Sequence, residues 1–435
     1  MMYIDNILFA IILIAGIGFF AKNVKELTRN INLGHDVNRT DHPSARWKNM
    51  AMIALGQSKM VKRPIAGFLH IIVYVGFIII NLEVLEIIID GLFGTHRVFA
   101  FLGGFYGVLI GSFEVLAVLV LVAVAAFWIR RNVIQLKRFA SSDLKGAPKK
   151  DADTILYFEV VLMSLFLIMN AFDLKFQDMN SGNIISQFLA PSPDVFSLEA
   201  VIIIERAAWW FHIIGILIFL NYLYYSKHLH ILLAFPNTYF ADLNAKGKLD
   251  NLESVTKEVK LMMDPNADPF AAQPVDENAV PGKFGASDVQ DLNWVQLLNA
   301  YTCTECGRCT SSCPANQTGK KLSPRKIMMD TRDRLEEVGK NIDANKGVFV
   351  PDNKSLLNDY ITAEELWACT SCNACVEECP VNISPLSIII DMRRYLVMEQ
   401  SAAPQSLNAM MANIENNGAP WQYNQQDRLN WKDEN

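Results

Sequence analysis

Charged residues are scarce in this chain. Only 19% of its 435 residues are Asp, Glu, Lys or Arg, whereas 51% are hydrophobic. An ordinary soluble domain carries about 25% charged residues, and the apolar residues here are concentrated in long runs before residue 235. The composition therefore predicts a membrane half followed by a soluble half.

Cysteine is absent before residue 303, and no cysteine lies outside two short runs. Thiols reserved for a metal need a reducing compartment, which excludes a disulfide framework. No block of Lys and Arg with interleaved aromatics follows the membrane half, so we expect no nucleic-acid partner. The amino terminus lacks a basic region and a small-residue cleavage site, which favours a retained span over a signal peptide.

The eight cysteines form two copies of the pattern Cys-x2-Cys-x2-Cys-x3-Cys-Pro. In proteins with two [4Fe–4S] clusters, the first three cysteines of such a run bind one cube and the fourth binds the other. Four-cysteine zinc sites are the alternative, but they usually use two Cys-x2-Cys pairs rather than an uninterrupted run. We therefore predict two clusters, whose ligand sets are Cys303, Cys306, Cys309 and Cys379 for cluster 1, and Cys369, Cys372, Cys375 and Cys313 for cluster 2.

Five apolar segments approach the roughly 20 residues that a membrane-spanning helix needs. They lie at residues 4–21, 64–89, 99–129, 154–172 and 198–225. The loop at residues 22–63 holds nine Lys or Arg and the loop at 130–153 holds seven, whereas the other two loops hold one each. Because basic loops stay in the cytoplasm, we expect the amino terminus outside the inner membrane and the cysteines in the cytoplasm.

The predicted fold class is all-α, in four parts. Residues 1–238 form a five-helix bundle in membrane lipid, and residues 239–289 form a polar linker with a short helix near 252–263. Residues 290–400 form a helical two-cluster domain, in which Ser323-Pro324 and Ser384-Pro385 each begin a helix. Residues 401–435 form a polar tail.

Histidines in the membrane half have positions that suit b-type haem. His70 lies six residues into the second span. His212 and His230 are 18 residues apart, which is five turns of one continuous helix, so both would project from one face about 27 Å apart. We predict that His70 and His230 hold an inner haem, and that His212, near the outer end of the fifth span, pairs with His96. The alternative for each is a hydrogen bond to a neighbouring helix.

Three further side chains are candidates for a quinone site. Glu83 and Glu86 lie near the outer end of the second span, where carboxylates suit the proton release of quinol oxidation. His228 precedes His230 by two positions, about 200° around a helix. We therefore expect His228 to face away from the inner haem and to meet a quinone or a carboxylate.

These residues carry a resemblance to known electron-transfer proteins. Through His70, His212 and Ser226-Lys227-His228-Leu229-His230, the membrane half resembles the five-helix cytochrome b subunit of respiratory nitrate reductase and its relatives in heterodisulfide reductase and dissimilatory sulfite-reduction complexes. The cysteine half resembles the C subunit of heterodisulfide reductase and the helical ferredoxin domains of succinate dehydrogenase and anaerobic glycerol-3-phosphate dehydrogenase. That cytochrome family has a second histidine in span two, where this chain has Ile80. The resemblance implies one b-type haem, or two if His96 replaces the missing ligand.

The resemblance also implies a partner. Longer relatives of the cysteine half continue through an Asn-Gly-x-Pro-Trp segment into a catalytic domain with Cys-Cys-Gly motifs. This chain has Asn417-Gly418-Ala419-Pro420-Trp421 but no Cys-Cys pair. We expect a separate, heterodisulfide-reductase-B-like catalytic protein in the cytoplasm, which docks on the helices after the cysteine runs and on Trp421 and Trp431 of the tail.

The sequence therefore predicts a membrane-bound oxidoreductase subunit that is catalytically incomplete alone. It would pass electrons between a menaquinone or ubiquinone pool, b haem, the two clusters and the catalytic partner. The alternative is a membrane-anchored ferredoxin-type adaptor with neither haem nor quinone chemistry. A reduced-minus-oxidised visible spectrum distinguishes the two.

Overall fold

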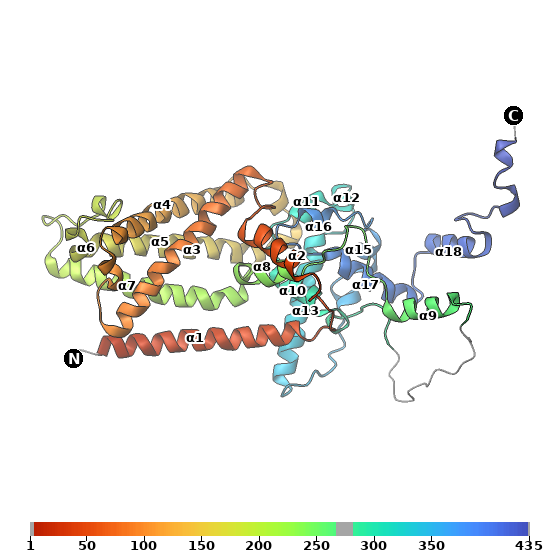
Figure 1. The fold of residues 1–435 in the computed structure, drawn as a ribbon, viewed down its shortest axis with the longest axis horizontal. Coiled ribbons are helices and arrows are strands. Elements are labelled where there is room, and N and C mark those ends of the chain that lie inside the picture. The colour runs from red at the N-terminus through yellow and green to blue at the C-terminus, as the bar shows by residue number, and fades with distance from the viewer. Residues whose placement is uncertain (1–3, 267–281, 434–435) are drawn as a thin grey trace.

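The computed structural model describes residues 4–266 and 282–433. Over these residues the fold is helical, with no β-strand and only two isolated bridges, His35 with Asn293 and Leu357 with Ile361. Long helices lie side by side in one half of the molecule, and shorter helices gather in the other half (Figure 1). The predicted all-α fold class is confirmed.

Five helices are long and apolar enough to cross a membrane. Their bounds are Ile4–Ile31 (α1), Pro64–Phe93 (α3), Gly104–Asn132 (α4), Ala147–Phe172 (α5) and Leu198–Tyr222 (α7). Neighbours along the chain pack together from α3 to α7, with the short helix α6 (Leu174–Asp178) between α5 and α7, and α1 packs against α7 and α3. The bundle leaves many large apolar side chains of α1 exposed, such as Ile7, Ile11 and Ile14, as a lipid-facing surface requires. The chain is a membrane protein.

Both basic loops lie at the same end of the bundle as the cysteine half, and the amino terminus lies at the far end (Figure 1). Arg325 of the cysteine half donates to Asp143 in the loop after α4, at 2.5 Å. Arg308 donates to the backbone oxygen of Lys59, in the loop after α1, at 3.1 Å. The predicted relative arrangement of loops and cysteines is therefore present, and the side of the membrane remains a prediction.

The fifth span does not continue as one helix to His230. The α7 helix ends at Tyr222, Leu223–Tyr225 forms a 3-10 turn, and Ser226 is extended with φ −122° and ψ 156°. A second 3-10 turn, Lys227–Leu229, leads into α8, His230–Tyr239. The carboxylate of Asp151 on α5 accepts from the Lys227 backbone N–H at 3.1 Å, which holds the break in place. The prediction that His212 and His230 share one continuous helical face is wrong.

The cysteine half is built from short helices around a single core. They are α10 (Trp294–Thr302), α11 (Arg308–Ser312), α12 (Pro314–Gln317), α13 (Pro324–Ala344), α14 (Leu356–Asp359), α15 (Ala363–Trp367), α16 (Ala374–Glu378) and α17 (Pro385–Met398). Ser323 and Ser384 accept hydrogen bonds from the backbone N–H of Lys326 and Ser387. The two predicted Ser-Pro helix starts are thus confirmed at α13 and α17.

Segments of the membrane half share the core of the cysteine half. Leu27 of α1 and Ala234 of α8 are buried in the same hydrophobic cluster as Leu297 and Met328. The short helix α2, Pro43–Met50, packs against α8. The boundary near residue 238 therefore separates two kinds of sequence but not two independent cores.

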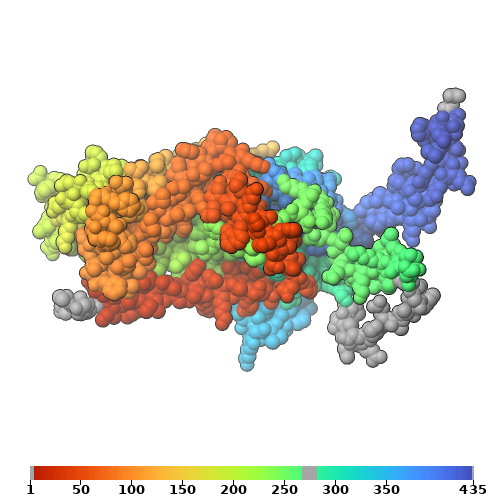
Figure 2. Space-filling model, in the orientation of Figure 1, coloured from red at the N-terminus to blue at the C-terminus, as the bar shows by residue number. Residues whose placement is uncertain are grey.

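The linker and the tail extend from the cysteine half. The helix α9, Glu253–Met263, lies where a linker helix was predicted, and linker residues 267–281 lie outside the described residues. The tail contains α18, Gln405–Asn417, which buries none of its residues. The tail projects away from the rest of the molecule (Figure 2), and Trp421 and Trp431 are 63% and 71% exposed. Its last two residues also lie outside the description.

Candidate functional site

The two cysteine runs adopt the same local backbone. In the first run, Glu305 and Gly307 have positive φ angles of 52° and 72°, and Gly307 begins α11. In the second run, Ser371 and Asn373 have φ angles of 55° and 60°, and Asn373 begins α16. Residues before and after the second cysteine of each run therefore turn the chain in the same left-handed way, so the sequence repeat is also a structural repeat.

Packing of α11 against α16 crosses the two runs. Cys303, Cys306, Cys309 and Cys379 line one cleft together with Cys375. Burial raises the pKa of the Cys309 thiol, and charge on Cys306, Cys303 and Cys379 raises it further. For Cys375, burial together with charge on Cys369 and Cys313 raises the pKa to about 12. The fourth cysteine of each run thus stands with the first three of the other run, as cross-ligation requires.

The spacing of the thiols bears on the zinc alternative. In residues 4–266 and 282–433, no group of three or more His, Cys, Asp or Glu side chains converges on one ion position. A structural zinc ion needs four ligands at about 2.0–2.3 Å from a single point. A cube binds each cysteine through a different iron, so a cluster does not need its four thiols to converge on one point.

His70, His228 and His230 gather at the end of the bundle next to the cysteine half. The rings of His228 and His230 stack with centroids 5.5 Å apart and planes 14° apart. Burial, together with the nearby imidazoles of His230 and His70, lowers the pKa of His228 to about 3. The expectation that His228 faces away from His230 is wrong, because the turn Lys227–Leu229 is not α-helical.

The hydrogen bonds of these histidines fit ligation of an iron porphyrin. His230 Nδ1 lies 2.9 Å from the Lys227 carbonyl oxygen, so that Nε2 is left with its lone pair free, as in most metal-ligating histidines. The buried Nδ1 atoms of His70 and His228 have no hydrogen-bond partner among the described residues. Buried polar atoms rarely stay unpartnered, so this end of the bundle has the donor set that a haem needs.

His212 and His96 lie apart from this group. His212 is the fifteenth residue of α7, near its middle rather than its outer end as predicted. It is 1% exposed, it packs against Phe166, and neither ring nitrogen has a partner among the described residues. His96 Nε2 instead lies 3.0 Å from Asp173 Oδ2, and its side chain is 38% exposed. No hydrogen bond or ring contact joins His96 to His212 in the part of the chain that the structure describes.

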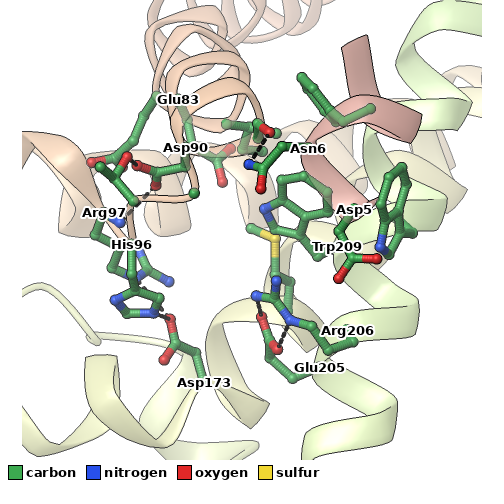
Figure 3. A pocket seen from close by; sticks show the side chains of 18 residues that line it. Asp5, Asn6, Glu83, Asp90, His96, Arg97, Asp173, Glu205, Arg206 and Trp209 are labelled. Atoms are coloured by element: carbon green, nitrogen blue, oxygen red, sulfur yellow. Dashed lines mark hydrogen bonds and ion pairs between the residues drawn. The ribbon is translucent and has the colours of Figure 1, made fainter. Parts of the chain in front are cut away.

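A cavity of about 250 Å³ opens at the far end of the bundle, between the ends of α1, α3 and α7 (Figure 3). Glu83 and Glu86 line it, and Trp209 and Trp210 of α7 face them. Glu86 accepts from the Tyr106 hydroxyl and the Phe99 backbone N–H, both at 2.9 Å, whereas Glu83 Oε2 has no partner among the described residues. Glu83 and Glu86 therefore lie at one end of the bundle, and the third quinone candidate, His228, lies at the opposite end.

Beside this cavity lies a buried polar network that the sequence reasoning missed. Arg97 donates to Asp173 and to Asn170, both at 2.8 Å, and packs over the Phe176 ring. Burial opposes ionisation of Asp173, but its hydrogen bond with His96 and the charge of Arg97 outweigh this and hold its pKa below the ordinary value. In the sequence, this network is represented only by Arg97, the one basic residue of its loop, and by Asp173, one of three Asp at positions 173–197.

Two contacts join the membrane half, near His228 and near the start of α3, to residues of the two cysteine runs. Lys227, the neighbour of His228, forms an ion pair with Glu305, which lies between Cys303 and Cys306. Lys59, five residues before α3, donates from Nζ to the Cys379 carbonyl oxygen at 3.3 Å. The predicted ligands of cluster 1 are therefore the ones that lie next to the membrane half.

Comparison with known proteins agrees with this arrangement. Residues 298–383 match the 4Fe-4S dicluster domain family. Over 99% of its length the chain is 30% identical to the probable iron-sulfur-binding oxidoreductase FadF of Bacillus subtilis, and over 92% it is 25% identical to the EtfAB:quinone oxidoreductase of Syntrophomonas wolfei. It spans only 61% and 55% of those relatives' lengths.

A shorter match concerns the cysteine half alone. It is 34% identical to the C subunit of the ferredoxin/F(420)H(2)-dependent CoB-CoM heterodisulfide reductase of Methanosarcina acetivorans, over 25% of this chain and 53% of that protein. No solved structure matches the chain. The predicted resemblance to heterodisulfide reductase subunits is confirmed, and the matches support [4Fe–4S] clusters in the cysteine half of this membrane protein.

Proposed function

We propose that the chain carries electrons between the quinone pool and a catalytic partner, through b haem and the two clusters. The observation that carries this proposal is the junction between the segments that hold His70, His228 and His230 and the predicted ligands of cluster 1, through the Lys227–Glu305 ion pair and the Lys59 bond to Cys379. An anchor alone needs no buried imidazoles with free nitrogens beside a cluster. The contacts of this junction are those of an electron route.

His70 and His230 are the proposed ligands of the inner haem. A b-type haem supplies one-electron transfer between a two-electron quinone and the clusters. The Lys227 carbonyl orients the His230 ring, and burial keeps the imidazole of His230 neutral by lowering its pKa. Only the neutral imidazole binds iron.

His212 is the proposed ligand of a second haem, if two are present. It lies one turn of α7 from Trp209, which lines the outer cavity, so a haem held there would stand between the cavity and the inner histidines. The hydrogen bond of its expected partner, His96, to Asp173 favours the arrangement with one haem.

The outer cavity is the proposed quinone site, for menaquinone or ubiquinone. Glu83 would exchange the proton, because its buried Oε2 has no hydrogen-bond partner among the described residues, whereas Glu86 accepts from Tyr106 and Phe99. The name of the relative from Syntrophomonas wolfei supports a quinone substrate. His228 is the alternative, at the inner end.

The partner is proposed to be a heterodisulfide-reductase-B-like catalytic unit of the Cys-Cys-Gly type, in the cytoplasm of a cell whose inner membrane holds the bundle. The relatives' greater length and the name of the Methanosarcina acetivorans relative support a further catalytic part. The exposed tail, with Trp421 and Trp431, is its proposed contact.

A spectroscopic experiment tests the whole route. The full chain, loaded with clusters and haem in detergent, is reduced with dithionite, and a short-chain menaquinone or ubiquinone is then added. We expect haem absorption bands in the reduced-minus-oxidised spectrum, and reoxidation of haem and clusters together. Glu83→Gln should slow quinone-driven reoxidation while leaving ferricyanide-driven reoxidation unchanged. A chain with clusters but without haem bands would support the ferredoxin-type adaptor instead.

A further inference from the structure

Three cations near the predicted cluster 1 form no close ion pair with a carboxylate of the described residues. Lys59 donates to the Cys379 carbonyl oxygen, and Arg308 lies between two of the ligands and donates to the backbone of Lys59. Arg138 packs beside Gly307, and its buried Nε has no hydrogen-bond partner in the part of the chain that the structure describes. Among the described residues, Lys59, Arg138 and Arg308 form no ion pair with any Asp or Glu.

Other cations near cluster 1 form ion pairs with carboxylates. Arg325 is paired with Asp143 at 2.5 Å, and Arg63 with Glu378 at 2.9 Å. Glu305 lies between Lys227 and Arg332. Among the described residues, the cations at this cube that lack a close ion pair are therefore Lys59, Arg138 and Arg308.

Among the described residues, one comparable cation lies beside the predicted cluster 2. Arg393 donates to the carbonyl oxygens of Leu366 and of Cys369, at 2.6 Å and 2.5 Å, and stacks over Trp367. Glu377, beside this run, is paired with Lys62 and Lys246. In the part of the chain that the structure describes, Arg393 forms no ion pair with a carboxylate.

Two other features affect the reduction potentials of the clusters less than the difference in cations between them does. Both ligand sets receive a backbone hydrogen bond at sulfur, from Ile383 to Cys379 at 3.3 Å and from Ser371 to Cys369 at 3.4 Å. Cys372 is the exposed cysteine, and water there favours reduction of cluster 2. Charges inside the protein are screened much less than charges in water, so the excess of cations at cluster 1 outweighs this exposure.

We infer that cluster 1, beside the membrane half, has the higher reduction potential, and that electrons step downhill from cluster 2 to cluster 1. Each step moves one electron and no proton, since the reduced cube is stabilised by fixed cations. Given the proposed function, electrons then run from the soluble partner through cluster 2, cluster 1 and the inner histidines toward quinone. Lys59 and Arg138 are positioning residues whose charge raises the reduction potential of cluster 1.

An electron paramagnetic resonance titration of the full chain tests this inference. The double variant Lys59→Gln/Arg138→Gln removes two charges but keeps hydrogen-bonding side chains. It should lower only the higher of the two midpoint reduction potentials. The expected decrease is at least 59 mV, which corresponds to a tenfold change in the equilibrium constant of a one-electron couple. Arg393→Gln should lower only the lower midpoint, and the exposed control Lys321→Gln should change neither. Iron and sulfide counts confirm that both cubes are present.

The inference is overturned if the double variant shifts the lower midpoint, or if it shifts neither. The cluster midpoints are measured without quinone and without haem, so these outcomes are independent of the proposed route. A chain that lacks haem would still show whether the cubes differ as inferred.

Discussion

The cysteine half and the membrane half position their chemical groups in different ways. In the cysteine half, all ligands come from two copies of one motif, with left-handed residues at the same two places, such as Gly307 and Asn373. In the membrane half, His70, His212 and His230 come from α3, α7 and α8 and belong to no common motif. A local motif can be recognised in sequence, whereas a site assembled by packing cannot.

The two ends of the membrane half differ as well. At the end away from the cysteine half, Arg97 has hydrogen-bond partners in Asp173, Asn170 and Tyr106. At the inner end, His70 and His228 each have a buried ring nitrogen without one among the described residues. A satisfied buried network stabilises the fold, and an unsatisfied one leaves a place for a ligand.

The largest effect is expected when cross-ligation is broken. Cys379→Ser should remove the cube bound by Cys303, Cys306 and Cys309, and Cys313→Ser should remove the other, because each fourth cysteine stands with the opposite run. Because cubes also hold the fold, partial unfolding of the cysteine half should follow. Electron paramagnetic resonance with iron counting measures this. Loss of the cube of the mutant's own run would show that the local motif alone suffices.

The next largest effect is expected on haem content, when single histidines are replaced. His70→Ala and His230→Ala should each abolish the same haem signal, because both side chains lie at the end of the bundle next to the cysteine half. His212→Ala should remove a different signal, or none if one haem is present. The matched control is His42→Ala, whose side chain is 79% exposed. Unchanged porphyrin content in His70→Ala would rule out the assignment and support the anchor alternative.

The free energy of unfolding should fall when the Arg97–Asp173 pair is broken. Asp173→Asn leaves the Arg97 charge buried without its counter-ion, and breaking such a pair costs about 3–5 kcal/mol. Thermal unfolding in detergent measures the loss, with Asp194→Asn in an exposed loop as the control. Because the folded-state pKa of Asp173 is lowered, the pair stabilises fully at neutral pH, and its contribution is lost as the pH falls through the folded-state pKa. An unchanged unfolding temperature would mean that the network is solvated.

The smallest effect on the chain itself is expected from removal of the tail. Truncation after Gln400 should leave haem and both clusters in place, because α18 buries no residue. It should weaken binding of the catalytic partner, since exposed tryptophans such as Trp421 and Trp431 are typical interface anchors. Pull-down before and after truncation, with cluster content as the control, measures both. Loss of clusters without loss of the partner would make the tail part of the cysteine half.

The sequence determined much of this protein by itself. Hydrophobic run length predicted five spans because a bilayer imposes a minimum helix length, and α1, α3, α4, α5 and α7 are all present. Cysteine spacing predicted the two-cluster domain because a cube imposes its own ligand spacing. Ser-Pro pairs predicted the starts of α13 and α17 because capping is a local effect.

Only the tertiary structure decided the arrangement around the histidines. A uniform helix placed His228 opposite His230, but Asp151, a carboxylate 76 positions away in the chain, accepts from Lys227 and holds a turn in which the two rings stack. The partnership of Arg97 with Asp173, and the contact of Lys59 with Cys379, likewise join residues far apart in sequence. Periodicity describes one element at a time, whereas these contacts depend on where several elements meet.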